Sequence, residues 1–268
     1  MGYWSIHLKK MMKGFSFIAT TVFLLMALSV SATTQVPNTV RYKGEKYEII
    51  DYDPLQPILA ARSINTHLLG LTDMDTGCWR GYVADFEVLD DKLYLLRIRG
   101  CTDSTKVIDL ATLFPKEHKD GKVWAWWFTG SLNIGNTPKW ITLWYKNYDN
   151  EIDLFIEQGK VNKLVMFDNS KTLPSKKFYE GKMAFQAFYH SELPKEILEK
   201  INGNITFRIE NSEEGNLFVS RFNDNLPSEV KDAISKVTEK IKDWPVVYTK
   251  GKFKAVSEFV FLKQPAKD

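Results

Sequence analysis

The chain has 268 residues, of which 44% are hydrophobic, 13% aromatic and 26% charged, and its formal net charge is +3. Residues 1–32 hold three lysines and no acidic residue, so the rest of the chain carries 33 basic and 33 acidic side chains. A formally neutral body argues against nucleic acid as a partner, because phosphate binding needs a basic surface. The length suits one large domain or two small ones.

The first 32 residues have the layout of a secretory signal peptide. Lys9, Lys10 and Lys13 precede an apolar run over residues 15–30, and small residues end the segment at Ala32. The run of about 16 residues is short for a bilayer span, which needs roughly 20. We expect cleavage after Ala32 and a periplasmic or secreted protein without a stable membrane anchor; an uncleaved anchor is the alternative.

Cys78 and Cys101 flank a predicted β-hairpin over residues 79–99, with its turn at Asp90-Asp91. A two-residue turn places Cys101 opposite Arg80 and diagonal to Cys78. Diagonal neighbours lie roughly 7–8 Å apart, slightly beyond the usual Cα spacing of a disulfide, so a register change or a bulge would have to close the gap. Two interpretations remain open: a disulfide formed in an oxidising compartment, or two separate buried thiols.

Catalytic chemistry has little support. Asp85 and Glu87 share one face of the hairpin and are the candidates for a hydrolase, but such a pair is more typical of the solvent-facing side of a sheet. His67 with Asp73 and Asp75 lies in a loop-like stretch without metal-ligand spacing. We therefore expect no enzyme, no catalytic residue, no metal and no cofactor.

Aromatic residues crowd the next segment. A helix is predicted over residues 106–114, followed by an antiparallel meander with strands at 123–128, 140–145, 152–157 and 161–167. The pattern puts aromatic side chains on one face of each of the first two strands. A buried core is the favoured interpretation, and a carbohydrate-binding row is the alternative. The carbohydrate candidates are Trp124, Trp126, Trp140 and Trp144.

The pattern changes after a polar linker predicted at residues 171–182. Residues 227–244 carry the clearest helical stripe, with Ser228 as the expected cap and Pro245 as the stop. The stripe consists of Val230, Ile234, Val237, Ile241 and Trp244. A short helix at 194–200 and four strands complete the order helix, strand, strand, helix, strand, strand.

This order and several of its residues resemble the carboxy-terminal domain of TonB-like proteins. The resemblance covers residues 183–264 and rests on the strand 201–209, the turn Glu214-Gly215-Asn216, the predicted helix, Trp244-Pro245 and Gly251-Lys252. The family's Tyr-Pro dipeptide before the first strand is replaced here by Leu193-Pro194. The resemblance implies that a peptide pairs with a sheet edge, for which the last strand supplies Glu258, Phe259, Val260 and Phe261.

The amino-terminal part resembles a set of uncharacterised exported bacterial proteins, on the segments 78–84, 92–95 and 121–130. That resemblance implies no activity. Together the patterns predict an α+β protein with a signal peptide at 1–32, an antiparallel β-rich domain at 33–170 and a TonB-like α+β domain at 183–268. The expected function is non-enzymatic protein or peptide binding, with carbohydrate binding and hydrolysis as alternatives.

Overall fold

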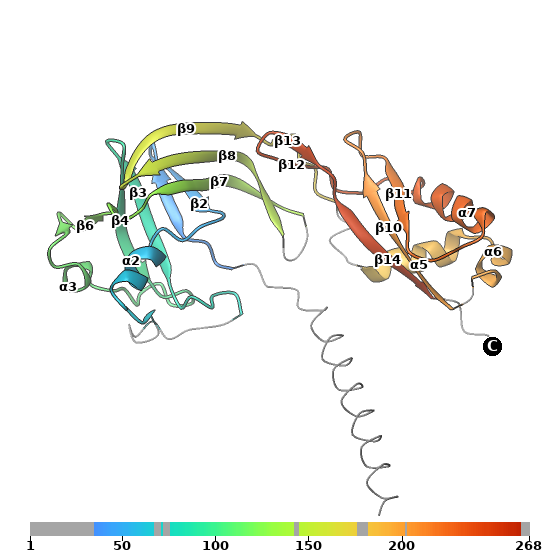
Figure 1. Cartoon of the computed structure of the whole chain (residues 1–268), viewed down its shortest axis with the longest axis horizontal. Coiled ribbons are helices and arrows are strands. Elements are labelled where there is room, and N and C mark those ends of the chain that lie inside the picture. The colour runs from blue at the N-terminus through green and yellow to red at the C-terminus, as the bar shows by residue number, and fades with distance from the viewer. Residues whose placement is uncertain are drawn as a thin grey trace, which may run out of the picture. The chain divides into compact units, whose positions relative to one another are not determined.

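The computed structural model describes residues 35–66, 71, 76–141, 145–175, 182–201 and 203–263 (Figure 1). All of them belong to one compact unit that spans residues 35–268. The expected signal peptide lies outside the described residues, and so do His67, Asp73, Asp75 and Trp144. Within the described residues, no helix is both long enough and apolar enough to cross a membrane.

The first half of the described chain is a strand-rich domain with two short helices. Its elements are β1 (Thr39–Tyr42), β2 (Glu45–Ile49), α2 (Gln56–Ala61), β3 (Val83–Leu89), β4 (Lys92–Arg99), α3 (Leu110–Leu113), β5 (His118–Lys119), β6 (Lys122–Trp124), β7 (Gly130–Trp140), β8 (Lys146–Glu157) and β9 (Lys160–Asp168). These strands form one sheet in the order β3-β1-β2-β7-β8-β9-β4-β6-β5.

The sheet closes on itself, because β3 also pairs with β4. The closure is short on one side: within the described residues β9 and β4 share the single ladder pair Lys92–Lys160, and backbone hydrogen bonds from Leu93 to Gly159 and from Val161 to Asp91 flank it. The pairings are antiparallel as predicted, except that β1 and β3 run parallel. A parallel pair needs a long connection, and the β2 strand and the α2 helix lie between these two strands in the chain.

The inside of this barrel is filled by side chains. Alternate residues of the strands point inward and form one hydrophobic cluster that includes Val40, Phe86, Leu95, Leu132 and Leu154, each at most 1% exposed. The helices α2 and α3 add buried residues such as Leu59 and Leu110 to the same cluster. The interior is therefore a packed core.

The aromatic segment folds differently from the prediction. Strand β6 ends at Trp124, and the Phe128 amide donates to the Ala125 carbonyl at 3.0 Å to close a turn. The strand predicted at 123–128 is thus wrong beyond its first residues, and β7 ends where the strand predicted at 140–145 begins. The predicted helix 106–114 is shortened to α3, because Val107 pairs with Arg99 and Asp109 caps the helix.

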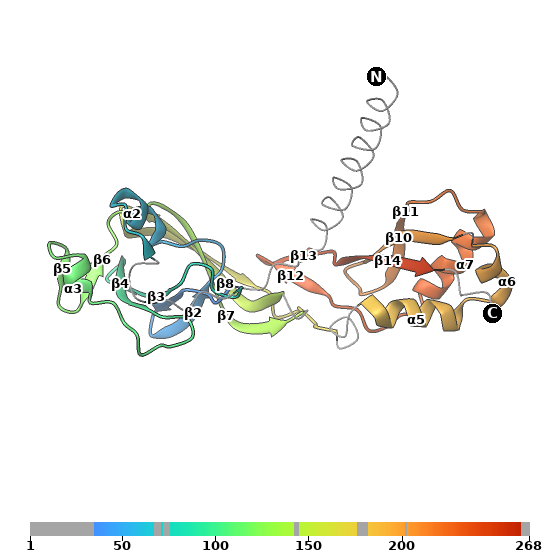
Figure 2. The same cartoon turned by 90° about the horizontal axis from the view of Figure 1, so that it is seen from below.

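The second half has the predicted mixture of helices and strands. Its elements are α5 (Lys182–Glu192), α6 (Lys195–Glu199), β10 (Asn204–Asn211), β11 (Leu217–Phe222), α7 (Ser228–Thr238), β12 (Val247–Thr249), β13 (Lys252–Lys254) and β14 (Ser257–Lys263). Strands β11, β10 and β14 form an antiparallel sheet in that order, while β12 and β13 form a separate hairpin. Helix α5, which the sequence analysis missed, contacts β14 (Figures 1 and 2).

The predicted helical stripe is confirmed as a core. Val230, Ile234 and Val237 are buried on α7, and Ile241 and Trp244 are buried just beyond it, in one cluster with Phe207 of β10. The helix is shorter than predicted, since it ends at Thr238. Pro227, not Ser228, occupies the cap position, and no side chain there bonds the first amides.

The segment expected as a linker begins with residues that are firmly held. Leu173 and Val246 exchange two backbone hydrogen bonds, at 2.8 and 2.9 Å. Thr172 and Ser175 are buried, and the Ser175 hydroxyl donates to the carbonyl of Asp243 at 2.9 Å. Residues 171–175 therefore pair with the chain that leads into the β12–β13 hairpin.

Candidate functional site

The last strand, β14, forms an edge of its sheet. It pairs with β10 along seven residues, and no strand of the described chain pairs with its other side. Phe259 and Phe261 are 44% and 54% exposed, whereas Val260 between them is 3% exposed and faces the core. The four residues predicted for peptide pairing thus alternate between the buried face and the exposed face of an edge strand.

The direction of the edge amides follows from one hydrogen bond. The Phe259 amide donates to the Glu258 carboxylate at 3.0 Å, so this N–H does not point toward β10. Because backbone groups alternate in direction along a strand, the amide of Phe261 points to the same free side. The edge therefore offers backbone donors and acceptors to an added strand, after displacement of the Glu258 side chain from one of them.

Polar and aromatic groups surround this edge on the exposed face. The guanidinium of Arg208, on the neighbouring strand β10, lies 5.9 Å from the centre of the Phe259 ring and donates to the Ser257 hydroxyl at 2.8 Å. An ion pair of 2.9 Å joins the same guanidinium to Glu210. The exposed face thus combines phenyl rings with an ion pair.

The tryptophans predicted as a core or as a carbohydrate-binding row are exposed where they are described. Trp124, Trp126 and Trp140 are 40%, 44% and 47% exposed, so the core interpretation is wrong for these three. Trp144 lies outside the described residues. Lysine side chains lie near two of the rings, Lys92 at 5.3 Å from Trp124 and Lys146 at 5.6 Å from Trp140.

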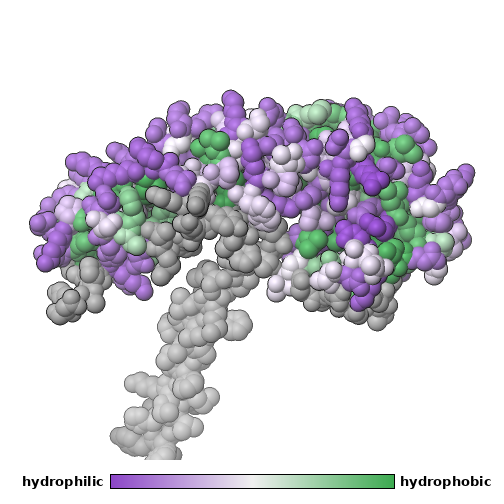
Figure 3. All heavy atoms as spheres, turned by 180° about the vertical axis from the view of Figure 1, so that it is seen from behind, coloured by the Kyte–Doolittle hydropathy of each residue, from purple (hydrophilic) through white to green (hydrophobic). Residues whose placement is uncertain are grey.

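The exposed indoles do not lie in one row. Trp124 is close to Gly159, at the end of the barrel where β7 begins, since its indole nitrogen donates to that carbonyl at 3.4 Å. Trp140 is the last residue of β7, an eleven-residue strand, which at about 3.3 Å per residue puts it roughly 30 Å away. On the face drawn in Figure 3, hydrophobic residues form separate patches among hydrophilic ones.

Asp85, the candidate acid of the hydrolase alternative, is held as an anion. One carboxylate oxygen accepts from Thr39 at 2.8 Å, and the other accepts from Arg97 and Arg99 at 2.7–3.1 Å. Burial by itself would raise the pKa of Asp85, but these hydrogen bonds outweigh it and hold the pKa below its ordinary value. A carboxylate so held is a poor proton donor, and the contacts assign Asp85 a structural role. Its predicted partner Glu87 lies on the same strand.

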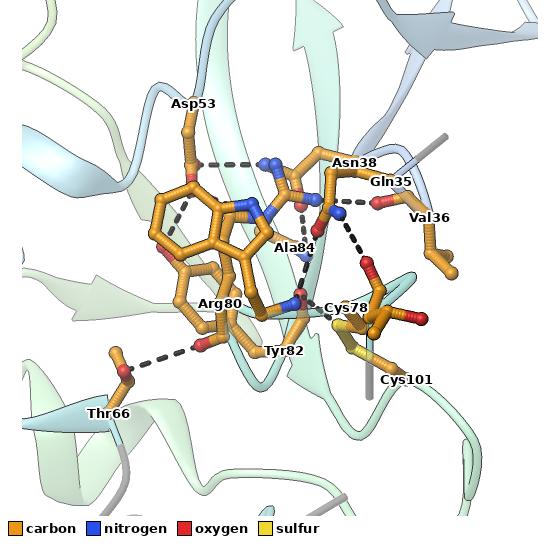
Figure 4. Close-up of a disulfide and its surroundings, with 12 residues drawn as sticks. Gln35, Val36, Asn38, Asp53, Thr66, Cys78, Arg80, Tyr82, Ala84 and Cys101 are labelled. Carbon is orange, nitrogen blue, oxygen red and sulfur yellow. Dashed lines mark hydrogen bonds and ion pairs between the residues drawn. A yellow bond between two sulfur atoms is a disulfide. The ribbon is translucent and has the colours of Figure 1, made fainter. Parts of the chain in front are cut away.

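The structure contains the disulfide that the sequence left open. Cys78 and Cys101 are bonded, with their Cα atoms 6.3 Å apart (Figure 4). A bulge at Leu96 does occur, but beyond it Val83 pairs with Arg99, which shifts the register of Cys101 away from Cys78. The gap is closed instead by a turn, in which the Gly81 amide donates to the Cys78 carbonyl at 3.0 Å.

A partly buried network fixes the chain around this disulfide. The Asp53 carboxylate accepts from the Tyr82 hydroxyl at 2.6 Å and from the Asn38 amide at 2.9 Å, while Arg80 donates to the carbonyl of Val36 at 2.6 Å (Figure 4). Burial, followed by the charge of Asp53, raises the pKa of Tyr82. These groups hold one another, and their arrangement is structural.

A second polar cluster, which the sequence analysis missed, lies beneath the tip of the β12–β13 hairpin. Asn169 is fully buried; its amide group donates to Glu151 at 2.8 Å and accepts from the Gly251 backbone at 2.8 Å. The Lys250 ammonium donates to both oxygens of Asp153, at 2.9 and 3.0 Å. The only sequence signal was an alternation of acidic and apolar residues along β8, which is also typical of a solvent-facing strand.

The cluster perturbs one carboxyl group. Burial raises the pKa of Glu151, and hydrogen bonds from the amides of Asn133 and Asn169 offset only part of this. Within the described residues, no group of three His, Cys, Asp or Glu side chains is arranged to hold a metal ion. This cluster therefore fastens the hairpin to the barrel, and nothing in its contacts points to a reacting group.

The chain was compared with protein-family models, with curated proteins and with solved structures, and none of them matches.

Proposed function

We propose that this chain is an exported, non-enzymatic binding protein whose TonB-like carboxy-terminal half takes up an extended peptide as an added strand on β14. The supporting observation is that, among the described residues, no strand pairs with the outer side of β14, where the Phe259 amide donates to the Glu258 side chain. An added strand would complete the hydrogen bonds of this edge.

The side chains of the edge define the kind of peptide. Residues of the added strand on the exposed face would lie beside the rings of Phe259 and Phe261, where aromatic and β-branched cross-strand neighbours are favoured. Arg208, next to Phe259, is already paired with Glu210 and so leaves no uncompensated charge at this end of the edge. We expect peptides with apolar residues at every second position.

Selection from a library of random eight-residue peptides displayed on phage tests this proposal. Phe261→Pro removes the outward N–H of the edge and should weaken binding of the selected peptides at least about tenfold. Phe261→Ala keeps the N–H and loses only the ring, so it should weaken binding less. Circular dichroism of both variants reports whether the sheet is intact. No enrichment of peptides, or full binding by folded Phe261→Pro, would contradict the proposal.

Carbohydrate binding is the second candidate, favoured by the exposure of Trp124 and Trp126 at one end of the barrel. Flat rings of this kind can stack on sugar rings, and titration calorimetry against a panel of polysaccharides discriminates the two functions. A saturable response lost in Trp126→Ala but kept in Phe261→Pro would favour carbohydrate over peptide.

A further inference from the structure

A cavity of about 310 Å³ opens on the outside of the barrel, far in sequence from the β14 edge. Strands β1 to β4 supply its lining, which includes Thr39, Arg41, Lys46, Asp85 and Arg97. Its volume is at the lower end of the range for small-ligand sites. Three of the lining side chains are cationic and one is acidic, so the charges of the cavity do not balance.

Two of the cations are placed directly against each other. Arg41 and Lys46 are cross-strand partners in the β1–β2 pairing, and both are exposed. Like charges in this position destabilise a sheet. Glu87 lies beside Arg41 in the β1–β3 pairing, yet no ion pair joins Arg41 or Lys46 to an acidic group in the part of the chain that the structure describes. An anion placed between them would relieve this repulsion.

The third cation is oriented by the protein itself. Arg97 donates through Nε and Nη2 to one oxygen of Asp85, at 2.9 and 2.7 Å, and half of its side chain is exposed. Arg99 bonds the same oxygen at 3.1 Å, so two guanidinium groups compensate the single carboxylate. The remaining N–H groups of Arg97 are therefore held in position without being neutralised.

The bulge in β4 creates this arrangement. The register between β3 and β4 shifts between Asp85 and Phe86, which leaves Leu96 as the extra residue. Bulges re-aim side chains at ligand sites and barrel rims. Here the bulge brings Arg97 opposite Asp85 and puts the half-buried Leu96 in the lining of the cavity. The cavity thus has a cationic part and an apolar part.

We propose that this cavity binds a small organic oxyanion, with its phosphate or carboxylate group between Arg41, Lys46 and Arg97 and its apolar portion against Leu96. Charge-assisted hydrogen bonds from guanidinium and ammonium groups are the strongest that such an anion can receive. The site is independent of the β14 edge and of peptide binding.

Titration of the purified full chain with inorganic phosphate and with butyl phosphate, followed by NMR chemical shifts, tests the site. We expect a saturable response to both, with tighter binding of butyl phosphate. Arg41→Gln/Lys46→Gln should weaken binding at least about tenfold. Lys119→Gln removes one positive charge from an exposed position on β5 outside the cavity and should leave binding unchanged. Vesicles containing phosphatidic acid distinguish a lipid headgroup from a free ligand. If the natural ligand is a lipid headgroup, the protein should bind these vesicles more tightly than it binds soluble butyl phosphate.

Thermal unfolding distinguishes loss of the anion site from loss of the fold in these variants. Without anion, the double variant should be at least as stable as the wild type, since it removes two opposed positive charges. Phosphate should raise the melting temperature of the wild type and not that of the double variant. The proposal is overturned if the wild type shows no saturable response to either phosphate or to vesicles, or if Lys119→Gln weakens binding as much as the double variant.

Discussion

Gly135 lies at a point of β7 where the neighbouring strand leaves no space for a side chain. A Cβ atom built on it would approach the Tyr148 Cβ to 2.8 Å, well inside van der Waals contact. The Tyr148 hydroxyl donates to Glu48 at 2.7 Å, so the ring is held at both ends and cannot swing aside freely. At this position glycine is required by the close approach of a ring.

Gly135→Ala should lower the free energy of unfolding by about 1–3 kcal/mol, the usual cost of overpacking a filled site. Denaturant unfolding measures the effect. The control is Tyr148→Gly, which removes the ring together with the Cβ atom that an added side chain would meet; in that background Gly135→Ala should cost much less. Equal costs in the two backgrounds would show that the ring is not the obstacle.

At the scale of elements, the β3–β4 hairpin depends on a crosslink as well as on its ladder. The disulfide Cys78–Cys101 closes a loop with a sequence separation of 23 residues. A crosslink of this span restricts the unfolded chain, and it holds the turn at Cys78 beside the end of β4.

Replacement of both cysteines in Cys78→Ser/Cys101→Ser should lower the free energy of unfolding by about 3 kcal/mol. Urea unfolding with and without dithiothreitol provides the check. Reductant should destabilise the wild type by a similar amount and leave the double variant unaffected. A wild type that is indifferent to reductant would contradict a stabilising role for the bond.

The helices and strands differ in how well local sequence pattern predicts them. The stripe Val230, Ile234 and Val237 was predictable, because helical spacing depends only on neighbours in the chain. The aromatic run after Lys122 was not, because density of tryptophan does not distinguish a buried strand from a turn that exposes Trp126.

The two candidate binding sites, the β14 edge and the cavity lined by β1 to β4, also differ in whether the sequence predicted them. The last strand was predicted as a sheet edge from the family resemblance, since Phe259, Val260 and Phe261 are all apolar and show no alternation in the sequence itself. The cavity depends on pairing between β1, β3 and β4, and the bulge that brings Arg97 to Asp85 leaves no local sequence signal. Contacts between residues far apart in the chain are the part that the sequence alone did not provide.

The described residues of the molecule form two hydrophobic cores, one inside the barrel and one beneath the β10, β11 and β14 sheet. The segments that link them make buried polar contacts as well as apolar ones. The Asn147 amide donates to the Tyr248 carbonyl at 2.6 Å, and Lys250 bonds Asp153 on β8. Buried polar contacts of this kind are stable only while every group keeps its partner.

Glu151 makes this link dependent on pH. Its pKa is raised above the ordinary 4.5, chiefly by burial, so the folded protein holds this proton more tightly than the unfolded chain does. Between 4.5 and the raised pKa, unfolding therefore releases a proton. The contribution of Glu151 to the free energy of unfolding falls as the pH rises through this window. Above the raised pKa the full cost of ionising the buried carboxyl group destabilises the folded protein.

Glu151→Gln should remove that dependence, because the amide oxygen still accepts the hydrogen bond from Asn169 but carries no charge. We expect the variant to be more stable than the wild type near neutral pH, with a flatter profile of unfolding free energy against pH. Urea unfolding at several pH values measures this. Glu157→Gln, at an exposed position of the same strand, is the matched control and should keep the wild-type profile. An unchanged profile in Glu151→Gln would mean that the carboxyl group is ionised in the folded protein without cost, and that the buried link between the two cores does not respond to pH.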